Sequence, residues 1–116
     1  MQAAEGLTLS GQLLGTPAYM SPEQAAGDRA AQGPSTDIYS LGVVLYRALA
    51  GRLPFDAREP AALIKAVLLD DPPPLRSVDR AIHPDLETIT HKCIEKLPAR
   101  RYASAGAIAQ ELRRFI

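Results

Sequence analysis

Apolar residues recur at three- and four-residue spacing in several stretches of the chain, and proline or glycine separates one stretch from the next. No stretch alternates apolar and polar residues as a half-buried strand would. The spacing therefore predicts a mainly α fold. A short helix is expected to begin at Pro22, with Ser21 as its N-cap, and to end by Gly27. Further helices are predicted over 59–69 and after Ser104. Another is predicted from Pro84 to about Lys96, and Leu97 continues the apolar side of this helix.

The longest predicted helix follows a cap at Ser35 or Thr36 and runs to Ala50, with Gly51 as its C-terminal stop. Apolar residues occur on all its sides, which is typical of a helix in the middle of a core. A chain of 116 residues supplies little protein to surround such a helix. We therefore expect it to need more surrounding protein than the chain contains, and Gly42 to allow a neighbour close approach.

Composition excludes several classes of function. The 13 basic and 13 acidic residues balance, which argues against nucleic acid as a partner. The single cysteine, Cys93, excludes an internal disulfide, and it falls on an apolar helix side as a small buried hydrophobe. Two histidines add no plausible ligand set, so no metal site is expected. Without a membrane-length apolar run or a secretion signal, we expect a cytoplasmic location.

Four blocks occur in one order: GTPAYMSPEQ at 15–24, DIYSLG at 37–42, LAGRLPF at 49–55 and KLPARRY at 96–102. In that order they resemble the C-terminal lobe of a serine/threonine protein kinase of the bacterial, eukaryotic-like type. Ser21-Pro22-Glu23 is similar to the Ala-Pro-Glu segment that closes the activation loop. The resemblance implies a partial kinase domain over 1–116 without an N-lobe. Residues 1–27 would be the activation segment with its closing short helix, and 35–116 the helical C-lobe.

The resemblance also assigns substrate-facing residues. Gly15, Thr16, Pro17 and Tyr19 would form the loop that receives the residue after the phosphoacceptor, with Thr16 favouring Ser or Thr hydroxyls. The alternative for this loop is an ordinary Gly-Pro turn with Tyr19 packed beneath it. Thr8 and Ser10 lie where activation-loop phosphorylation sites fall in the family, and an unmodified terminus is the simpler alternative for this chain.

Three charged residues are implied as structural anchors. The family pairs Glu23 with an arginine before the last helix, here Arg101, with Arg100 as the alternative partner. Two exposed, solvated charges are the other possibility, and such pairs contribute little. The family's aspartate at Asp37 accepts hydrogen bonds from the catalytic loop, which this chain lacks. A first-turn helix charge explains Asp37 as well. Leu97 departs from the family, which has Asp or Asn there.

The motifs that carry phosphoryl transfer are missing from the 116 residues. No Val-Ala-x-Lys, His-Arg-Asp or Asp-Phe-Gly occurs, so no catalytic residue or nucleotide site is expected here. The parent enzyme would use ATP and Mg²⁺ to phosphorylate Ser or Thr in protein substrates, and its N-lobe would be this chain's partner. We expect the chain alone to be an inactive kinase fragment. The alternative is a degenerate kinase remnant acting as a helical interaction module.

Overall fold

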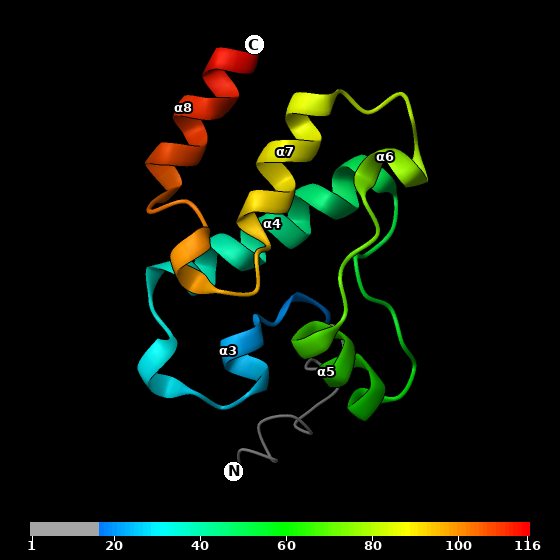
Figure 1. Ribbon diagram of the computed structural model, residues 1–116, viewed down its shortest axis with the longest axis vertical. Coiled ribbons are helices and arrows are strands. Elements are labelled where there is room, and N and C mark those ends of the chain that lie inside the picture. Colours follow the sequence, from blue (N-terminus) through cyan, green and yellow to red (C-terminus); the bar gives the residue numbers. More distant parts are fainter. Residues whose placement is uncertain (1–16) are drawn as a thin grey trace.

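The computed structural model describes residues 17–116, and these residues form helices and turns without any strand. The prediction of a mainly α fold is confirmed. Figure 1 shows the arrangement of the elements. The α-helices are α3 (Pro22–Ala25), α4 (Pro34–Ala50), α5 (Pro60–Leu69), α6 (Leu75–Val78), α7 (Pro84–Cys93) and α8 (Ala105–Phe115). Three 3₁₀ turns are η1 (Pro17–Tyr19), η2 (Arg29–Ala31) and η3 (Pro98–Arg100).

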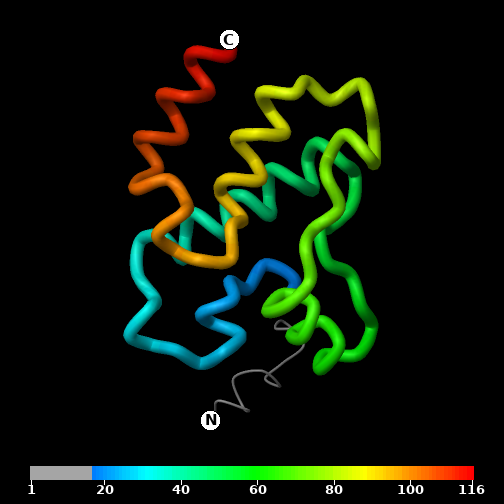
Figure 2. Tube along the Cα trace, in the orientation of Figure 1, coloured from blue at the N-terminus to red at the C-terminus, as the bar shows by residue number. Residues whose placement is uncertain are grey.

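Helix α4 crosses the middle of the molecule and separates two groups of elements (Figure 1). On one side α7 packs across it, and α8 packs on α7; on the other side lie α3 and α5, which contact each other. The turn η1 contacts both α4 and α5. Figure 2 follows the two connections that link the groups, residues 51–59 from α4 to α5 and residues 70–74 from α5 back to α6.

The division into two groups is matched by two apolar clusters. The smaller consists of Phe55, from the connection before α5, with Leu63 and Val67 of α5. The larger joins α4 to α6, α7 and α8. Its buried members are Ile38, Tyr39, Val43, Tyr46, Leu75, Ile82, Ile89, Cys93, Ile94, Tyr102 and Ile108. Cys93 is fully buried, and burial raises the pKa of its thiol to about 11, so the expected role as a small hydrophobe is confirmed.

The closest approach between α4 and α7 occurs at Gly42. A Cβ placed there would lie 2.5 Å from the Cβ of Cys93 and 2.7 Å from Cγ2 of Ile94. Both distances are far shorter than the roughly 3.5–4.0 Å at which non-bonded carbon atoms make contact. The expected close approach at this glycine is therefore present, and it sets the distance between the two helices.

The ends of two helices differ from the sequence prediction. Helix α4 begins at Pro34 with Gly33 as its N-cap, because the Thr36 hydroxyl accepts a hydrogen bond from the Gly33 N–H at 3.0 Å. The predicted caps at Ser35 and Thr36 are thus wrong by two to three residues. The predicted end at Gly51 is correct, since this residue adopts the left-handed conformation with φ of 75°.

The predicted extension of the 84–96 helix to Lys96 is also wrong. Helix α7 ends at Cys93, and Leu97 is 56% exposed instead of lying on an apolar side. The backbone carbonyls of Glu95 and Lys96 accept hydrogen bonds from Arg101 instead of continuing the helix. The short helix α6 was not predicted at all, because four residues are too few to show a period.

Helix α4 is not enclosed by the described residues on every side. Leu41 is 37% exposed and Val44 is 50% exposed, and both lie on the side of the helix that also carries Asp37. Within residues 17–116, no helix combines the length and the apolar character that crossing a bilayer requires.

Candidate substrate-loop anchor

The N-terminal cap of helix α3 fixes the backbone that carries Glu23. The Ser21 hydroxyl accepts a hydrogen bond from the Gln24 N–H at 3.2 Å, and the Gln24 side-chain oxygen accepts one from the Ser21 N–H at 2.9 Å. This reciprocal capping box satisfies two backbone donors that a helix otherwise leaves free. Pro22 at the first helical position adds a backbone already suited to the helix, and Glu23 follows with its side chain turned inward.

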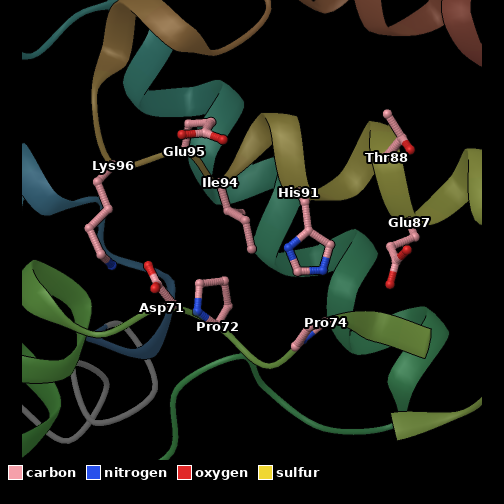
Figure 3. Close-up of a pocket in the computed structure, with 9 residues that line it drawn as sticks. All are labelled: Asp71, Pro72, Pro74, Glu87, Thr88, His91, Ile94, Glu95 and Lys96. Carbon is pink, nitrogen blue, oxygen red and sulfur yellow. The ribbon is translucent and has the colours of Figure 1, made fainter. Parts of the chain in front are cut away.

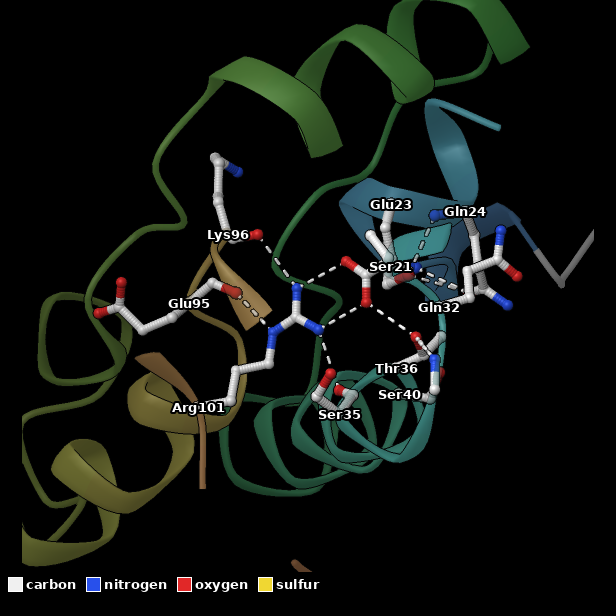
Figure 4. Close-up of polar contacts among 12 residues, drawn as sticks. Ser21, Glu23, Gln24, Gln32, Ser35, Thr36, Ser40, Glu95, Lys96 and Arg101 are labelled. Atoms are coloured by element: carbon white, nitrogen blue, oxygen red, sulfur yellow. Dashed lines mark hydrogen bonds and ion pairs between the residues drawn. The ribbon is translucent and has the colours of Figure 1, made fainter. Parts of the chain in front are cut away.

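Glu23 meets Arg101 in a bidentate ion pair (Figure 4). Nη1 of Arg101 lies 2.7 Å from Oε2 of Glu23, and Nη2 lies 2.8 Å from Oε1. The two residues are only 5% and 4% exposed, so water does not screen the pair. The alternative partner, Arg100, is exposed. The sequence hypothesis of two solvated surface charges does not describe these residues.

Arg101 uses all five of its N–H donors in this site. Besides the two bonds to Glu23, Nη1 donates to the Ser35 carbonyl at 2.9 Å. Nε donates to the Glu95 carbonyl at 2.7 Å, and Nη2 donates to the Lys96 carbonyl at 3.1 Å. Because a guanidinium carries five N–H groups, none is left unsatisfied. The side chain therefore ties helix α3 to the start of α4 and to the loop after α7 (Figure 4).

The carboxylate of Glu23 is stabilised in its charged form. Burial alone would raise its pKa. The pKa is nevertheless lowered below its usual value, because the carboxylate accepts hydrogen bonds from Arg101, the Glu23 backbone and Thr36 and lies beside the charge of Arg101. The Thr36 hydroxyl donates to Oε2 at 2.8 Å. The centroid of the Tyr39 ring lies 5.0 Å from the guanidinium carbon of Arg101. Burial raises the pKa of Tyr39 to about 12, so its phenol stays neutral.

The loop residue Tyr19 is held on α4 at both of its ends. The Ser40 hydroxyl donates to the Tyr19 carbonyl at 3.0 Å, and Nη1 of Arg47 donates to the Tyr19 hydroxyl at 2.9 Å. Pro17 begins the turn η1, and the Pro17 carbonyl accepts a hydrogen bond from the Met20 N–H at 3.2 Å. The sequence did not assign Ser40 or Arg47 to the site. The signals it carried were that Ser40 lies in the DIYSLG block and that Arg47 is the only basic residue of its helix.

The remaining site residues are not brought into this network. Asp37 is exposed in the first turn of α4, and no hydrogen bond joins its carboxylate to residues 17–116. Gly15, Thr16, Thr8 and Ser10 lie outside the described residues, so their assignments stay predictions.

The described residues do not provide a site for the magnesium ion that the resemblance implies. Across residues 17–116, no group of three or more His, Cys, Asp or Glu side chains is placed to hold a metal ion. Magnesium prefers several oxygen ligands together with substrate phosphates. We therefore derive no chemical step through ATP and Mg²⁺ from this part of the chain.

A pocket of about 420 Å³ lies between the 70–74 connection and α7 (Figure 3). His91 points into it, and its Nε2 accepts a hydrogen bond from the Leu75 N–H at 3.1 Å. Accepting that bond requires a neutral imidazole with its proton on Nδ1. Burial lowers the pKa of His91, and the charges of Glu87 and Glu95 oppose the shift in part. Across the same connection, the Tyr46 hydroxyl donates to the Pro73 carbonyl at 2.7 Å. No pattern in the sequence indicated this pocket.

Sequence comparisons match nearly the whole chain. The family described as the protein kinase domain matches residues 3–112. The chain is 43% identical over 105 residues to the serine/threonine-protein kinase Pkn1 of Myxococcus xanthus, covering 90% of this chain and 15% of that protein. It is 39% identical over 102 residues to PksC, a serine/threonine-protein kinase of Streptomyces coelicolor, covering 88% of this chain and 18% of that protein. The chain thus spans less than a fifth of the length of these relatives.

Solved structures show the same arrangement of helices. The twitchin kinase region of C. elegans superimposes with a TM-score of 0.72 at 28% identity, over 85% of this chain and 16% of that one. The autoinhibited serine kinase domain of titin superimposes with a TM-score of 0.73 at 22% identity, over 84% of this chain and 30% of that one. At that identity the titin match concerns the fold alone.

Proposed function

Since the chain belongs to the protein kinase family, we propose that it is the substrate-facing loop and helical scaffold of a serine/threonine kinase. The parent reaction is transfer of the γ-phosphate of ATP, with Mg²⁺, to Ser or Thr of a protein substrate. Residues 1–116 alone do not catalyse it, because the lysine, the catalytic aspartate and the magnesium ligand of phosphoryl transfer are missing from this sequence. A cytoplasmic location and an N-lobe as partner remain predictions.

The ion pair between Glu23 and Arg101 is the observation that carries this proposal. Catalysis of phosphoryl transfer depends mainly on positioning, so a loop that receives the substrate must be fixed relative to the scaffold. Glu23 follows the loop by a few residues, and its carboxylate is bonded to a guanidinium that also binds three backbone carbonyls of the scaffold. The loop residue Tyr19 is bonded separately to α4. Both contacts hold the loop at one place beside α4.

A chimera tests the scaffold role. Residues 17–116 would replace the aligned segment of Myxococcus xanthus Pkn1, and incorporation of labelled phosphate from ATP into a protein substrate would be measured. We expect the chimera to retain transfer, and the same chimera with Arg101→Ala to lose at least tenfold, because the loop would be released. A folded chimera without activity contradicts the proposal. Purified residues 1–116 should show no transfer, and measurable transfer would contradict the predicted inactivity.

A second candidate function is favoured by the apolar side of α4. Leu41 and Val44 remain exposed there, and exposed neighbouring apolar residues are typical of interaction surfaces. Under this hypothesis the chain is a degenerate kinase remnant that binds a protein partner as a helical module. An inactive but folded chimera, together with a partner whose binding Val44→Lys abolishes, would favour the module over the kinase scaffold.

A further inference from the structure

Two hydrogen bonds place the phenol of Tyr19 at a defined point on α4. Ser40 binds the Tyr19 carbonyl, and Arg47 binds its hydroxyl. The two donors are separated by seven residues, or about 10 Å along a helix axis. The half-buried tyrosine therefore extends along α4, and its hydroxyl lies beside the guanidinium of Arg47.

Among the described residues, the charge of Arg47 has no counterpart. Within residues 17–116, no carboxylate oxygen lies within 4.0 Å of its nitrogen atoms, whereas Arg101 is paired with Glu23 and Arg114 with Glu111. Arg47 is exposed, and it is the only basic residue of α4. The bond to Tyr19 uses one of the five N–H donors of a guanidinium. As far as residues 17–116 are concerned, the other donors of Arg47 are free, so a positive charge able to bind an acceptor lies beside Tyr19.

We infer that Arg47 and Tyr19 form a subsite for an acidic side chain of the protein substrate, near the Ser or Thr that is phosphorylated. The inference rests on the proposed function, because it assumes that the loop faces the substrate. An arginine binds carboxylates through two parallel N–H groups. The Tyr19 hydroxyl accepts from Arg47 and so keeps its own hydrogen for the same carboxylate. Since the chain has a net charge of zero, a preference for acidic peptides would come from this local charge.

Peptide binding to the full 116-residue chain tests the subsite. Three fluorescein-labelled peptides would carry one serine among alanines, with glutamate, alanine or lysine on both sides of the serine, and binding would be followed by polarisation. We expect the glutamate peptide to bind about two- to fivefold more tightly than the alanine peptide, and the lysine peptide more weakly. The differences should shrink at high salt, because ions screen an exposed charge.

Substitutions distinguish a local subsite from general attraction. Arg47→Glu should invert the order of the three peptides. Arg47→Gln, which keeps a donor for Tyr19, should abolish the preference without inverting it. Arg113→Glu is the matched control, since it makes the same change in net charge at an exposed position of α8 and should keep the original order. Amide shifts in an NMR titration should locate the peptide at Tyr19 and Arg47.

The outcomes separate the inference from the function on which it rests. Equal binding of the three peptides, with shifts at Tyr19, would overturn the acidic subsite and leave the loop as the substrate site. Shifts confined to another surface would overturn the subsite even if the glutamate peptide were preferred. No binding of any peptide would count against the substrate-facing loop and therefore against both.

Discussion

The side chain of Arg101 alone connects several separate parts of the chain. Its five hydrogen bonds reach one carboxylate and three backbone carbonyls, and these belong to parts of the chain that are far apart in sequence. A lysine could not reproduce them, because an ammonium has three donors and no planar fork. The residue thus acts as a structural connector whose value depends on geometry as much as on charge.

Removing this connector should strongly destabilise the chain. We expect Arg101→Ala to lower the free energy of unfolding by about 3–5 kcal/mol, because Glu23 would remain buried without a counter-charge. Urea denaturation measures the change. Arg100→Ala is the matched control, since Arg100 is exposed, and it should change stability by less than about 0.5 kcal/mol.

Arg101→Lys provides a milder variant in case the alanine variant does not fold. It keeps the charge but not the bidentate geometry, so an intermediate loss is expected. Equal stability of the Arg101→Ala and Arg100→Ala variants would show that the buried pair does not hold the fold together.

At the scale of the elements, the contact of α4 with α7 depends on the missing side chain at Gly42. Alanine is the better helix former by about 1 kcal/mol, but its Cβ would lie 2.5 Å from the Cβ of Cys93, which cannot rotate away. Overpacking of this kind costs about 1–3 kcal/mol. We therefore expect Gly42→Ala to be destabilising in urea denaturation, because the helices must move apart.

Gly106→Ala serves as the control for this substitution. Gly106 is also helical, and the nearest atom to its added Cβ would be Ser104 Oγ at 3.6 Å, an ordinary contact. Only the gain in helix propensity should remain there, so this variant is expected to be slightly more stable. If both glycine substitutions stabilise the chain, the close approach of α4 and α7 is not a constraint.

The helices could be predicted from sequence where local signals determine them. Pro60 and Pro84 each stand at the first position of their helices, and Gly51 ends α4, so these boundaries were found within a residue. The end of α7 was missed because it depends on Arg101, whose side chain takes the carbonyls beyond the helix. A contact made by a distant residue leaves no mark in the local spacing.

The site shows the same limit. The motifs indicated Glu23 and Arg101 through the family resemblance, since both are recognisable residue types at recognisable places. The backbone carbonyls that share the guanidinium carry no residue-type signal, so no pattern could reveal them. Arg47 could be seen as the lone base of its helix, but its contact with Tyr19 depends on how η1 folds back on α4.

For the whole molecule, stability should fall in two steps as the pH decreases. The first step belongs to His91, whose folded-state pKa is lowered below the ordinary value of 6.5. The unfolded chain then binds the proton more readily, so stability is full above pH 6.5 and declines as the pH falls towards the folded-state pKa. Protonation also removes the acceptor for the Leu75 N–H, whereas the negative charges of Glu87 and Glu95 favour the imidazolium and moderate the change.

The second step belongs to Glu23. Its folded-state pKa is also lowered, from 4.5, so its contribution is present above pH 4.5 and is lost as the pH falls through the folded-state pKa. Urea denaturation at a series of pH values should resolve both steps. His91→Gln keeps an acceptor that cannot titrate, so only the upper step should disappear. An unchanged slope between pH 7 and 5 in this variant would assign that step to other groups.

The ion pair between Glu23 and Arg101 joins residues 78 positions apart. A ribosome makes the chain from the N-terminus, so Glu23 is synthesised long before its partner, and the tunnel delays Arg101 further. Until that arginine emerges, the carboxylate has no buried counter-charge, and the loop next to it lacks one of its two attachments to the scaffold. The residues beside Glu23 are thus made before the contact with Arg101 that helps to hold them can form. Nascent chains that stop before Arg101 should accordingly keep this loop open to proteases.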